Sequence, residues 1–387
     1  MLKDYYADLH IHVGRNQYGG PVKITASKHL TIENILLEAS ERKGIDIVGV
    51  IDCQAPAVLE ELQQLLSDSK AVEKKEGGIQ FGNTTLMLGS EIEIYDQNCA
   101  GPIHVLCYFP FLKSMTIFSN WLSDHMKNSQ LSSQRFYGSA VALQQKTKEL
   151  DGIFIPAHVF TPFKSLFGKG VRQSLEEVFN PEWIDAIELG LSADTHMADQ
   201  IAELHRYTYV TNSDAHSLAK IAREYQLIRM AEPTFKELQM AFHQIEERKV
   251  IKNFGMNPRL GKYYTTVCQK CLRPYKESPC PQCESVTFIK GVADRIAELK
   301  TSSQPLSNRP AYLYQVPLEY IPALGPKTLD KLIDHFGNEM SVIHHVNKEA
   351  LIPVIGNKIA EMIIQLREGK LLIESGGGGK YGKIAHK

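Results

Sequence analysis

Two kinds of apolar pattern alternate along residues 1–254. Residues 32–43 repeat apolar side chains with a helical period, whereas residues 45–51 form a nearly uninterrupted β-branched run that is typical of a buried parallel strand. The alternation continues, and the pattern predicts helices over 57–74, 117–126 and 138–150 and strands over 86–93, 103–106, 153–157, 184–189 and 207–212. Such alternation favours a parallel α/β fold, a β/α barrel with its site at the carboxyl ends of the strands.

The first expected strand carries a row of polar side chains. In an extended segment Asp8, His10 and His12 would share one face, while Leu9 and Ile11 would enter a core. A His-x-His pair alone fits either a metal site or two hydrogen-bonded core histidines. Residues at the ends of the other expected strands are therefore needed to distinguish these two alternatives.

Further acids and histidines lie at or near the ends of the expected strands. They are Asp52, Glu91, His104, His158, Asp214 and His216. Each of them alone is compatible with a hydrogen-bonded core group or a surface group. A barrel would bring them together, however, and carboxylates packed so closely repel one another unless cations lie between them. The sequence therefore predicts a metal cluster.

This run of motifs resembles the PHP family, named for polymerase and histidinol phosphatase, over residues 5–235. The matching motifs are Asp8–His12, Gly44–Asp52, Gly89–Glu91, His104, Pro156–His158 and Ser213–His216. The resemblance implies a distorted β/α barrel that holds two or three divalent cations (Zn²⁺, Mn²⁺ or Mg²⁺) and hydrolyses phosphoesters. The ligands it implies are His10, His12, Glu91 and Asp214 for one cation and the shared Glu91 with His104 and His158 for the second.

A third cation, as the resemblance implies, would use His216 together with a histidine directly after Asp52. This chain has Cys53 at that position. A Cys53 thiolate would favour zinc, whereas a neutral thiol would leave the third site weak or empty, so two cations are the expectation. Two cations can activate a bridging water as hydroxide and clamp the attacking and leaving oxygens of a phosphodiester. The candidate catalytic residues are Glu91, Asp214 and His216, although ligation alone would explain Asp214 or His216.

A loop of aromatic, glycine and basic residues follows His158. Its aromatic rings could stack a base and its cations could hold phosphates, as in single-strand binders, or the loop could be a packed lid with solvated lysines. The candidate contacts in this loop are Phe160, Phe163, Lys164, Lys169 and Arg172. Lys28, in the segment 24–28, is a weaker candidate for a phosphate contact.

Composition separates the two parts of the chain. Residues 255–387 hold 18 Lys+Arg against 12 Asp+Glu, whereas residues 1–254 hold 25 against 32. A basic segment suits a polyanion such as nucleic acid, with solvated surface as the alternative. The chain has neither an apolar run of about 20 residues nor a signal-peptide pattern, so we expect a soluble cytoplasmic, nucleoid-associated protein without a membrane partner.

Four of the seven cysteines form two C-x-x-C knuckles in this basic part. They are Cys268, Cys271, Cys280 and Cys283. This spacing is typical of a structural zinc ion held by four thiolates, which leaves no open position for catalysis.

Two later segments share a glycine turn between helix-like stretches. Residues 321–329 centre on Gly325 with Lys327, and residues 351–360 centre on Gly356 with Lys358. The pair resembles tandem helix-hairpin-helix motifs, whose backbone N–H groups bind a DNA phosphate without reading sequence. A protein-docking helical bundle is the alternative.

The expected organisation is a barrel (1–254), a four-cysteine zinc domain (255–300), a hairpin region (301–375) and a flexible Gly/Lys tail (376–387). Together these parts resemble the endonuclease Q family of DNA repair enzymes. The resemblance implies cleavage on the 5′ side of uracil, hypoxanthine, xanthine or an abasic site in DNA, which leaves 3′-hydroxyl and 5′-phosphate ends. Replication and repair proteins are candidate further partners.

The alternatives are a PHP-type 3′-5′ exonuclease or phosphatase and a non-catalytic DNA-binding scaffold. Tandem DNA-binding hairpins are superfluous for a small-molecule phosphatase. No G-x-x-x-x-G-K-[ST] motif is present, which argues against an ATP-driven helicase.

Overall fold

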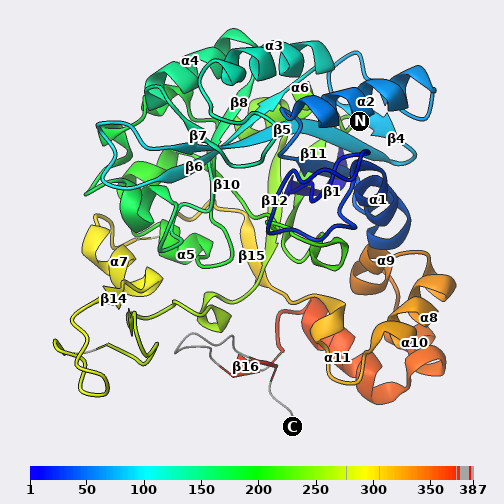
Figure 1. Cartoon of the computed structure of the whole chain (residues 1–387). Coiled ribbons are helices and arrows are strands. Elements are labelled where there is room, and N and C mark those ends of the chain that lie inside the picture. The colour runs from blue at the N-terminus through cyan, green and yellow to red at the C-terminus, as the bar shows by residue number, and fades with distance from the viewer. Residues whose placement is uncertain (276, 305, 372, 375–382, 385–387) are drawn as a thin grey trace.

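A strongly bent sheet forms the centre of the computed structural model, which describes residues 1–275, 277–304, 306–371, 373–374 and 383–384. Figure 1 shows this sheet beneath α3 and α4. The strands around the centre are β1 (Lys3–Ile11), β2 (Ile47–Val50), β5 (Thr84–Ile94), β6 (Ile103–Phe109), β8 (Ile153–Pro156), β9 (Ala186–Glu188), β10 (Thr208–Val210), β11 (Tyr225–Met230) and β12 (Lys249–Gly255). β1, β2 and β5 run parallel, as the sequence predicts.

Two other parts of this sheet are antiparallel, so the expected parallel pairing is corrected there. β6 pairs antiparallel with β5 and β8, and β11 pairs antiparallel with β1 and β12. The connection from β5 to β6 is too short for the helical crossover that a parallel pair needs. The reversal puts the beginning of β6, with His104, beside Glu93 near the carboxyl end of β5.

The ring closes through β9 and β10 with few backbone bonds. Two backbone N–H···O bonds of 3.0 Å join β8 and its following residues to the β9 segment, and β9 pairs in parallel with β10. Side chains bridge the next gap: Gln226 Oε1 accepts from the N–H of Thr211 at 2.8 Å, and Asn253 Nδ2 donates to the carbonyl of Tyr209 at 3.3 Å. The result is a distorted barrel.

The barrel interior is apolar at its centre. Each strand of the ring from β1 to β11 sends at least one buried side chain into the same cluster, which includes Leu9, Ile47, Met87, Leu106, Ile155, Ala186, Val210 and Ile228. Helix α6 (Phe235–Phe242) closes one end, with Phe235, Leu238 and Phe242 in this cluster. Thr208, at the start of β10, donates to the carbonyl of Phe242 at 2.7 Å, so α6 lies at the end opposite to the residues that follow β10.

β1 changes face along its length, which corrects the expected alternation. The pairing of β1 with β2 shifts register between Asp8 and Ile11. Leu9 therefore joins the barrel interior, whereas Ile11 packs in the larger core beneath the outer helices.

The outer helices differ from the expected ones mainly at their ends. They are α1 (Ile32–Leu37), which continues as a π-helix (Glu38–Lys43), α2 (Pro56–Ser67), α3 (Leu112–Ser123), α4 (Ala140–Glu149) and α5 (Thr195–Ala198). The helix expected over 57–74 ends at Ser67, because the following residues form β3 (Val72–Glu73), which pairs with β4 (Ile79–Phe81). The helix expected over 117–126 begins five residues earlier and buries Leu112, Met115, Phe118 and Leu122.

The C-terminal region is joined to the barrel rather than separate from it. β15 (Ala311–Tyr314) pairs in parallel with β12, so the segment predicted as a separate hairpin region contributes a strand to the barrel sheet. The helices that follow are α8 (Pro326–Phe336), α9 (Glu339–His344), α10 (Lys348–Ile355) and α11 (Asn357–Arg367). Figure 1 shows them on the side of the barrel that carries α1.

Buried polar contacts fix these helices in place. Lys43 Nζ lies 2.8 Å from Glu339 Oε1, and both side chains are buried. The ring of His344 stacks on Tyr6 at 4.9 Å and accepts a 2.7 Å hydrogen bond from the hydroxyl of Tyr225. Burial lowers the pKa of His344 to about 3, so the ring stays a neutral acceptor.

The zinc-type knuckles begin at the end of β13 (Val267–Cys268) and lie in the segment that connects it to its antiparallel partner β14 (Phe288–Ile289), which is followed by α7 (Val292–Leu299). No helix in the described part of the chain is long and apolar enough to cross a membrane. Of the predicted tail, residues 376–382 and 385–387 lie outside the described residues. β17 (Lys383–Ile384) pairs with β16 (Ile373–Glu374).

One buried acid at the start of β11 leads to a prediction about stability. Glu224 is fully buried; its Oε1 accepts from the N–H of Met256 at 2.7 Å, and its Oε2 has no partner among the described residues. Burial raises the pKa of Glu224 to about 8, against about 4.3 in an unfolded chain. Between these two values the folded protein binds a proton that the unfolded chain lacks, so the free energy of unfolding falls by about 1.4 kcal/mol per pH unit as pH rises.

We therefore expect Glu224→Gln to gain stability relative to the wild type between pH 6 and pH 8. Urea unfolding at several pH values measures the difference, with the exposed Glu41→Gln as the matched control. Parallel stability curves for the wild type and Glu224→Gln would contradict the prediction.

Candidate metal centre and nucleic-acid surfaces

Six of the predicted ligands gather in two groups at the open end of the barrel, opposite α6. His10, His12 and Asp214 form one group, and Glu91, His104 and His158 form the other. Within each group the ligand atoms lie within 4.8 Å of one another. A pocket of about 480 Å³ is lined by residues of both groups.

Glu91 stands between the two groups, from the last third of β5. Its Oε1 lies 2.9 Å from His104 Nδ1 and 3.3 Å from His158 Nε2, and its Oε2 lies 3.7 Å from His12 Nε2. Burial alone would raise the pKa of Glu91, but His104, Lys23 and the hydrogen bonds around it hold the pKa well below its usual range. Glu91 is therefore a permanent carboxylate that reaches both groups.

Asp214 completes the first group from the segment after β10. Its Oδ1 lies 3.5 Å from the Nε2 atoms of both His10 and His12. The backbone of Asp214 has φ +46°, and the Arg223 guanidinium donates to its carbonyl at 3.2 Å. Burial opposes ionisation, but the two histidines keep the pKa of Asp214 well below its usual range.

The donor atoms fit divalent cations. The Nε2 atoms of His10, His12 and His104 are buried and have no hydrogen-bond partner among the described residues. Burial lowers the pKa of His10, but the carboxylates of Glu188, Asp214 and Glu91 outweigh it and raise the pKa to about 10. Orphaned imidazole nitrogens facing carboxylate oxygens are a donor set for Zn²⁺ or Mn²⁺. His10, His12 and Asp214 would hold one cation and His104 and His158 a second, with Glu91 between them.

Glu188 is a site residue that the sequence did not reveal as one. It ends β9, and its Oε1 lies 2.9 Å from His10 Nδ1. Its oxygens also accept from Asn212 Nδ2 and from the N–H of His158, each at 2.8 Å. A carboxylate behind a ligating histidine fixes the tautomer and orientation of the ring. Its position at a strand end was the only signal in the sequence.

Asp52 orients the ring of His12, as Glu188 orients the ring of His10. Its Oδ2 lies 3.0 Å from His12 Nδ1 and accepts from the N–H of Val13 at 2.7 Å. The prediction of Asp52 as a metal ligand is therefore corrected to that of a positioning residue. Asp8 is also a supporting residue, because it accepts from the N–H groups of Ser213 at 3.0 Å and Ala222 at 2.8 Å.

Cys53 is not part of the cluster. Its thiol is fully buried in the apolar core and donates to the carbonyl of Val50 at 3.1 Å. Burial raises the pKa of Cys53, so the thiol stays neutral. The assignment of Cys53 as a candidate metal ligand is therefore corrected: of the two alternatives, the structure fits the neutral thiol, whose side chain points away from the strand end that Asp52 faces.

His216 lies at the rim of the first group. Its ring centroid is 4.6 Å from that of His12, and its Nδ1 lies 3.0 Å from the carbonyl oxygen of Asp214. Burial and the neighbouring His12 lower the pKa of His216. A neutral imidazole at the pocket wall is able to accept a proton.

The loop after His158 divides into a buried part and an exposed part. Phe160 is 2% exposed and stacks on Phe167 at 5.4 Å, so the prediction that it contacts DNA is corrected: it is a core residue. Phe163 is 45% exposed, lines the pocket and meets Tyr263 edge-on at 5.5 Å.

The cations of this loop reach the surface. Lys164 Nζ lies 2.8 Å from Glu93 Oε2, and the neighbouring His104 and Lys164 lower the pKa of Glu93 to about 2. Lys169, Arg172 and the distant Lys28 are exposed. Their contact with DNA stays a prediction.

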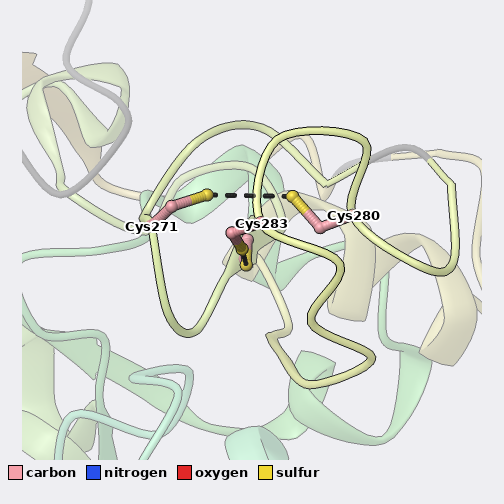
Figure 2. A group of neighbouring side chains, drawn as sticks. Cys271, Cys280 and Cys283 are labelled. Carbon is pink, nitrogen blue, oxygen red and sulfur yellow. Dashed lines mark hydrogen bonds between the residues drawn. The ribbon is translucent and has the colours of Figure 1, made fainter.

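The four cysteines of the knuckles converge. The Sγ atoms of Cys268 and Cys283 lie 3.5 Å apart and those of Cys271 and Cys280 3.7 Å apart; Figure 2 shows the second pair beside Cys283. A disulfide bond is about 2.05 Å long, so all four thiols are free. All four sulfur atoms lie within 4.8 Å of one another, which fits one tetrahedral zinc ion.

The two glycine turns differ from each other. In the second, α10 and α11 flank Gly356, whose φ of +78° favours glycine. In the first, only a single 3₁₀ turn (Leu318–Tyr320) precedes the Gly325 segment and α8, so the expected leading helix is wrong. Both Gly325 and Gly356 are exposed, as are Lys327 and Lys358.

These two lysines give a prediction for DNA binding. Neither Lys327 nor Lys358 has an ion-pair partner within the described ranges. We expect Lys327→Ala with Lys358→Ala to weaken binding equally on all sequences and to lower the magnitude of the salt slope by about 2. Fluorescence anisotropy between 50 and 200 mM salt measures the slope, with Lys113→Ala on α3 as the control. An unchanged slope would contradict a phosphate role.

No family model matches the chain. The chain is 51% identical over 385 residues to the uncharacterized protein YqxK of Bacillus subtilis (strain 168). The aligned residues cover 99% of this chain and 100% of YqxK. Its structure is similar to the crystal structure of the lesion-specific endonuclease PfuEndoQ from Pyrococcus furiosus, with a TM-score of 0.84 and 30% sequence identity over 99% of this chain and 95% of that chain.

A second solved structure gives the same similarity. Endonuclease Q in complex with a 27-mer duplex substrate, which carries an abasic lesion at the active site, matches with a TM-score of 0.84 and 30% identity. The match covers 100% of this chain and 97% of that chain. Because similarity at this level extends through the barrel, the four-cysteine segment and the C-terminal helices alike, the chain belongs to the endonuclease Q family.

Proposed function

We propose that this chain is a metal-dependent DNA repair endonuclease that hydrolyses the phosphodiester on the 5′ side of a deaminated base or an abasic site. The observation that carries the proposal is the convergence of two nitrogen and oxygen ligand groups on Glu91, in a pocket open to solvent. A family member of the same overall structure holds an abasic duplex at its active site.

Different side chains at the pocket have different roles in the proposed reaction. Two divalent cations would supply Lewis acidity and an activated water and would neutralise the phosphate. Glu188 and Asp52 hold the rings of His10 and His12 in one orientation. His216, with its lowered pKa, is placed at the rim to accept a proton from the attacking water.

A second cavity, of about 190 Å³, adjoins the metal pocket and shares His158, Thr161 and Asp214 with it. Asn257 and Tyr263 also line this cavity. We assign this cavity to the damaged nucleotide, which has to leave the base stack before its 5′ phosphate reaches the cluster. A mispaired or missing base costs less to extrude than a paired one, which favours damaged sites.

The remaining parts fit a duplex substrate. The Gly325 and Gly356 turns would bind backbone phosphates of the duplex, and the four cysteines would hold a structural zinc ion. With DNA as its substrate, the protein is proposed to act at the nucleoid. The barrel cations are proposed as Zn²⁺, Mn²⁺ or Mg²⁺.

The test uses purified protein with Mn²⁺, Mg²⁺ or Zn²⁺ and end-labelled duplexes that carry one uracil, one hypoxanthine, one xanthine, one abasic site or no lesion. A single nick directly 5′ of the lesion, ending in a 3′-hydroxyl and a 5′-phosphate, is the expected result. Progressive shortening from a 3′ end would instead identify an exonuclease. Binding without cleavage under all three metals would identify a scaffold.

A further inference from the structure

Lys23 is held rigidly beside the metal groups, although no motif pointed to it. Its N–H donates to the carbonyl of Val13 at 2.8 Å, directly after the ligand His12. The preceding residue, Val22, donates to Gly14 and accepts from the N–H of Ser132 at 2.9 Å. The backbone of Lys23 is therefore fixed between the end of β1 and the segment around Ser132.

The side chain of Lys23 points into the site. Its Nζ lies 3.2 Å from Glu91 Oε2 and 2.5 Å from Ser133 Oγ, and the side chain is 15% exposed. Ser133 also donates to Glu91 Oε2, and its Oγ lies 3.0 Å from that of Ser132. The ammonium group thus lies on the Oε2 side of Glu91, whereas His104 and His158 lie on the Oε1 side.

An ammonium group in this position keeps capacity for a ligand. Of its three N–H donors, Glu91 and Ser133 engage two among the described residues. Lys23 lines the same pocket as His12, Asp214 and His216. Two bound cations would share the charge of Glu91, so the positive charge of Lys23 would be less compensated and an anionic oxygen in the pocket would be its partner.

We propose that Lys23 is a catalytic residue: its ammonium group binds a non-bridging oxygen of the scissile phosphate and stabilises the charge that grows there in the transition state. This inference rests on the proposed function and adds a contact that no cation supplies. As water attacks, one P–O bond forms and the bond to the 3′ oxygen breaks. The attacking water loses its proton to solvent and the leaving 3′ oxygen takes up a proton from solvent, while Lys23 keeps its own.

The alternative is a purely structural lysine that holds Glu91 in place. Both roles predict slower cleavage when Lys23 is removed, so a rate alone does not separate them. A structural role acts through the Glu91 carboxylate and therefore changes metal binding. A catalytic role acts on the phosphate and leaves metal binding intact.

The experiment compares Lys23→Ala and Lys23→Arg with the wild type and with the exposed control Lys113→Ala on α3, in single-turnover cleavage of an abasic duplex. We expect Lys23→Ala to cut about 10² to 10³ times more slowly, the effect of removing one charge-stabilising donor, and Lys23→Arg to recover part of the rate. Mn²⁺ stoichiometry and affinity by calorimetry, and DNA affinity by anisotropy, should match the wild type. Loss of a Mn²⁺ site in Lys23→Ala would overturn the proposal in favour of the structural role.

A second substrate tests the contact itself. A methylphosphonate at the scissile linkage removes the charge of the phosphate, so it should slow the wild type strongly and Lys23→Ala much less. Equal slowing of both proteins would mean that Lys23 does not touch the phosphate and would refute the inference. Failure of the wild type to nick the unmodified duplex would refute the proposed function, and the inference with it.

Discussion

Asp214→Asn is expected to reduce cleavage by far more than 100-fold while DNA binding stays nearly unchanged. Removing a residue that only hydrogen-bonds to a metal ligand costs about 10- to 100-fold in metal affinity or activity. Asp214 is expected to be a ligand itself, because its Oδ1 lies 3.5 Å from the Nε2 atoms of His10 and His12, so a larger loss is expected. Asparagine keeps the shape but removes the charge. It also tolerates the left-handed backbone at φ +46°, so the loop is preserved.

Asp151→Asn is the matched control for this variant. Asp151 also has a positive φ, of +55°, but it is exposed and lies between α4 and β8. Single-turnover cleavage and anisotropy on the same abasic duplex measure the two effects. If the DNA affinity of Asp214→Asn fell as much as its cleavage rate, Asp214 would belong to the DNA-binding surface rather than to the metal centre.

Glu188→Gln is expected to weaken metal binding by about 10- to 100-fold, because the carboxylate that orients His10 is lost. Glutamine keeps the acceptor for the N–H of His158, so the barrel should remain folded. A Mn²⁺ titration of the cleavage rate measures the change, and excess Mn²⁺ should restore most of the activity.

The exposed Glu182→Gln, in the 3₁₀ turn Pro181–Trp183 before β9, serves as the control. Activity that stays low at saturating Mn²⁺ would contradict an orienting role for Glu188. It would indicate that the carboxylate acts in the reaction itself.

The convergence of the six ligand candidates was predictable, because each lies at or near a strand end and a barrel brings strand ends together. Their role as metal ligands stays a prediction. The direction of β6 was not predicted, although a signal was present: only eight residues connect β5 to β6, and a parallel pair needs a crossover of about a dozen or more. A run of apolar residues does not indicate whether its strand is parallel or antiparallel to the neighbouring strand.

The residues whose positions or roles were not predicted correctly differ for local physical reasons. Adjacent side chains near a strand end point in opposite directions, so the orientation of Asp52 toward His12 sends Cys53 into the core. Phe160 and Phe163 look equivalent in the sequence, and only packing against Phe167 separates them. Glu188 and Lys23 gain their roles from neighbours far away in the chain, which no short motif records.

The strand β15 has a consequence for how this enzyme meets a duplex. Because β15 continues the barrel sheet and His344 and Glu339 anchor the helices behind it, the glycine turns and the metal centre keep a constant separation. If the glycine turns bind phosphates as proposed, we expect their contacts to lie at a constant distance along the duplex from the metal centre. Deleting residues 301–387 would remove these turns and also expose the β12 edge, which invites self-association.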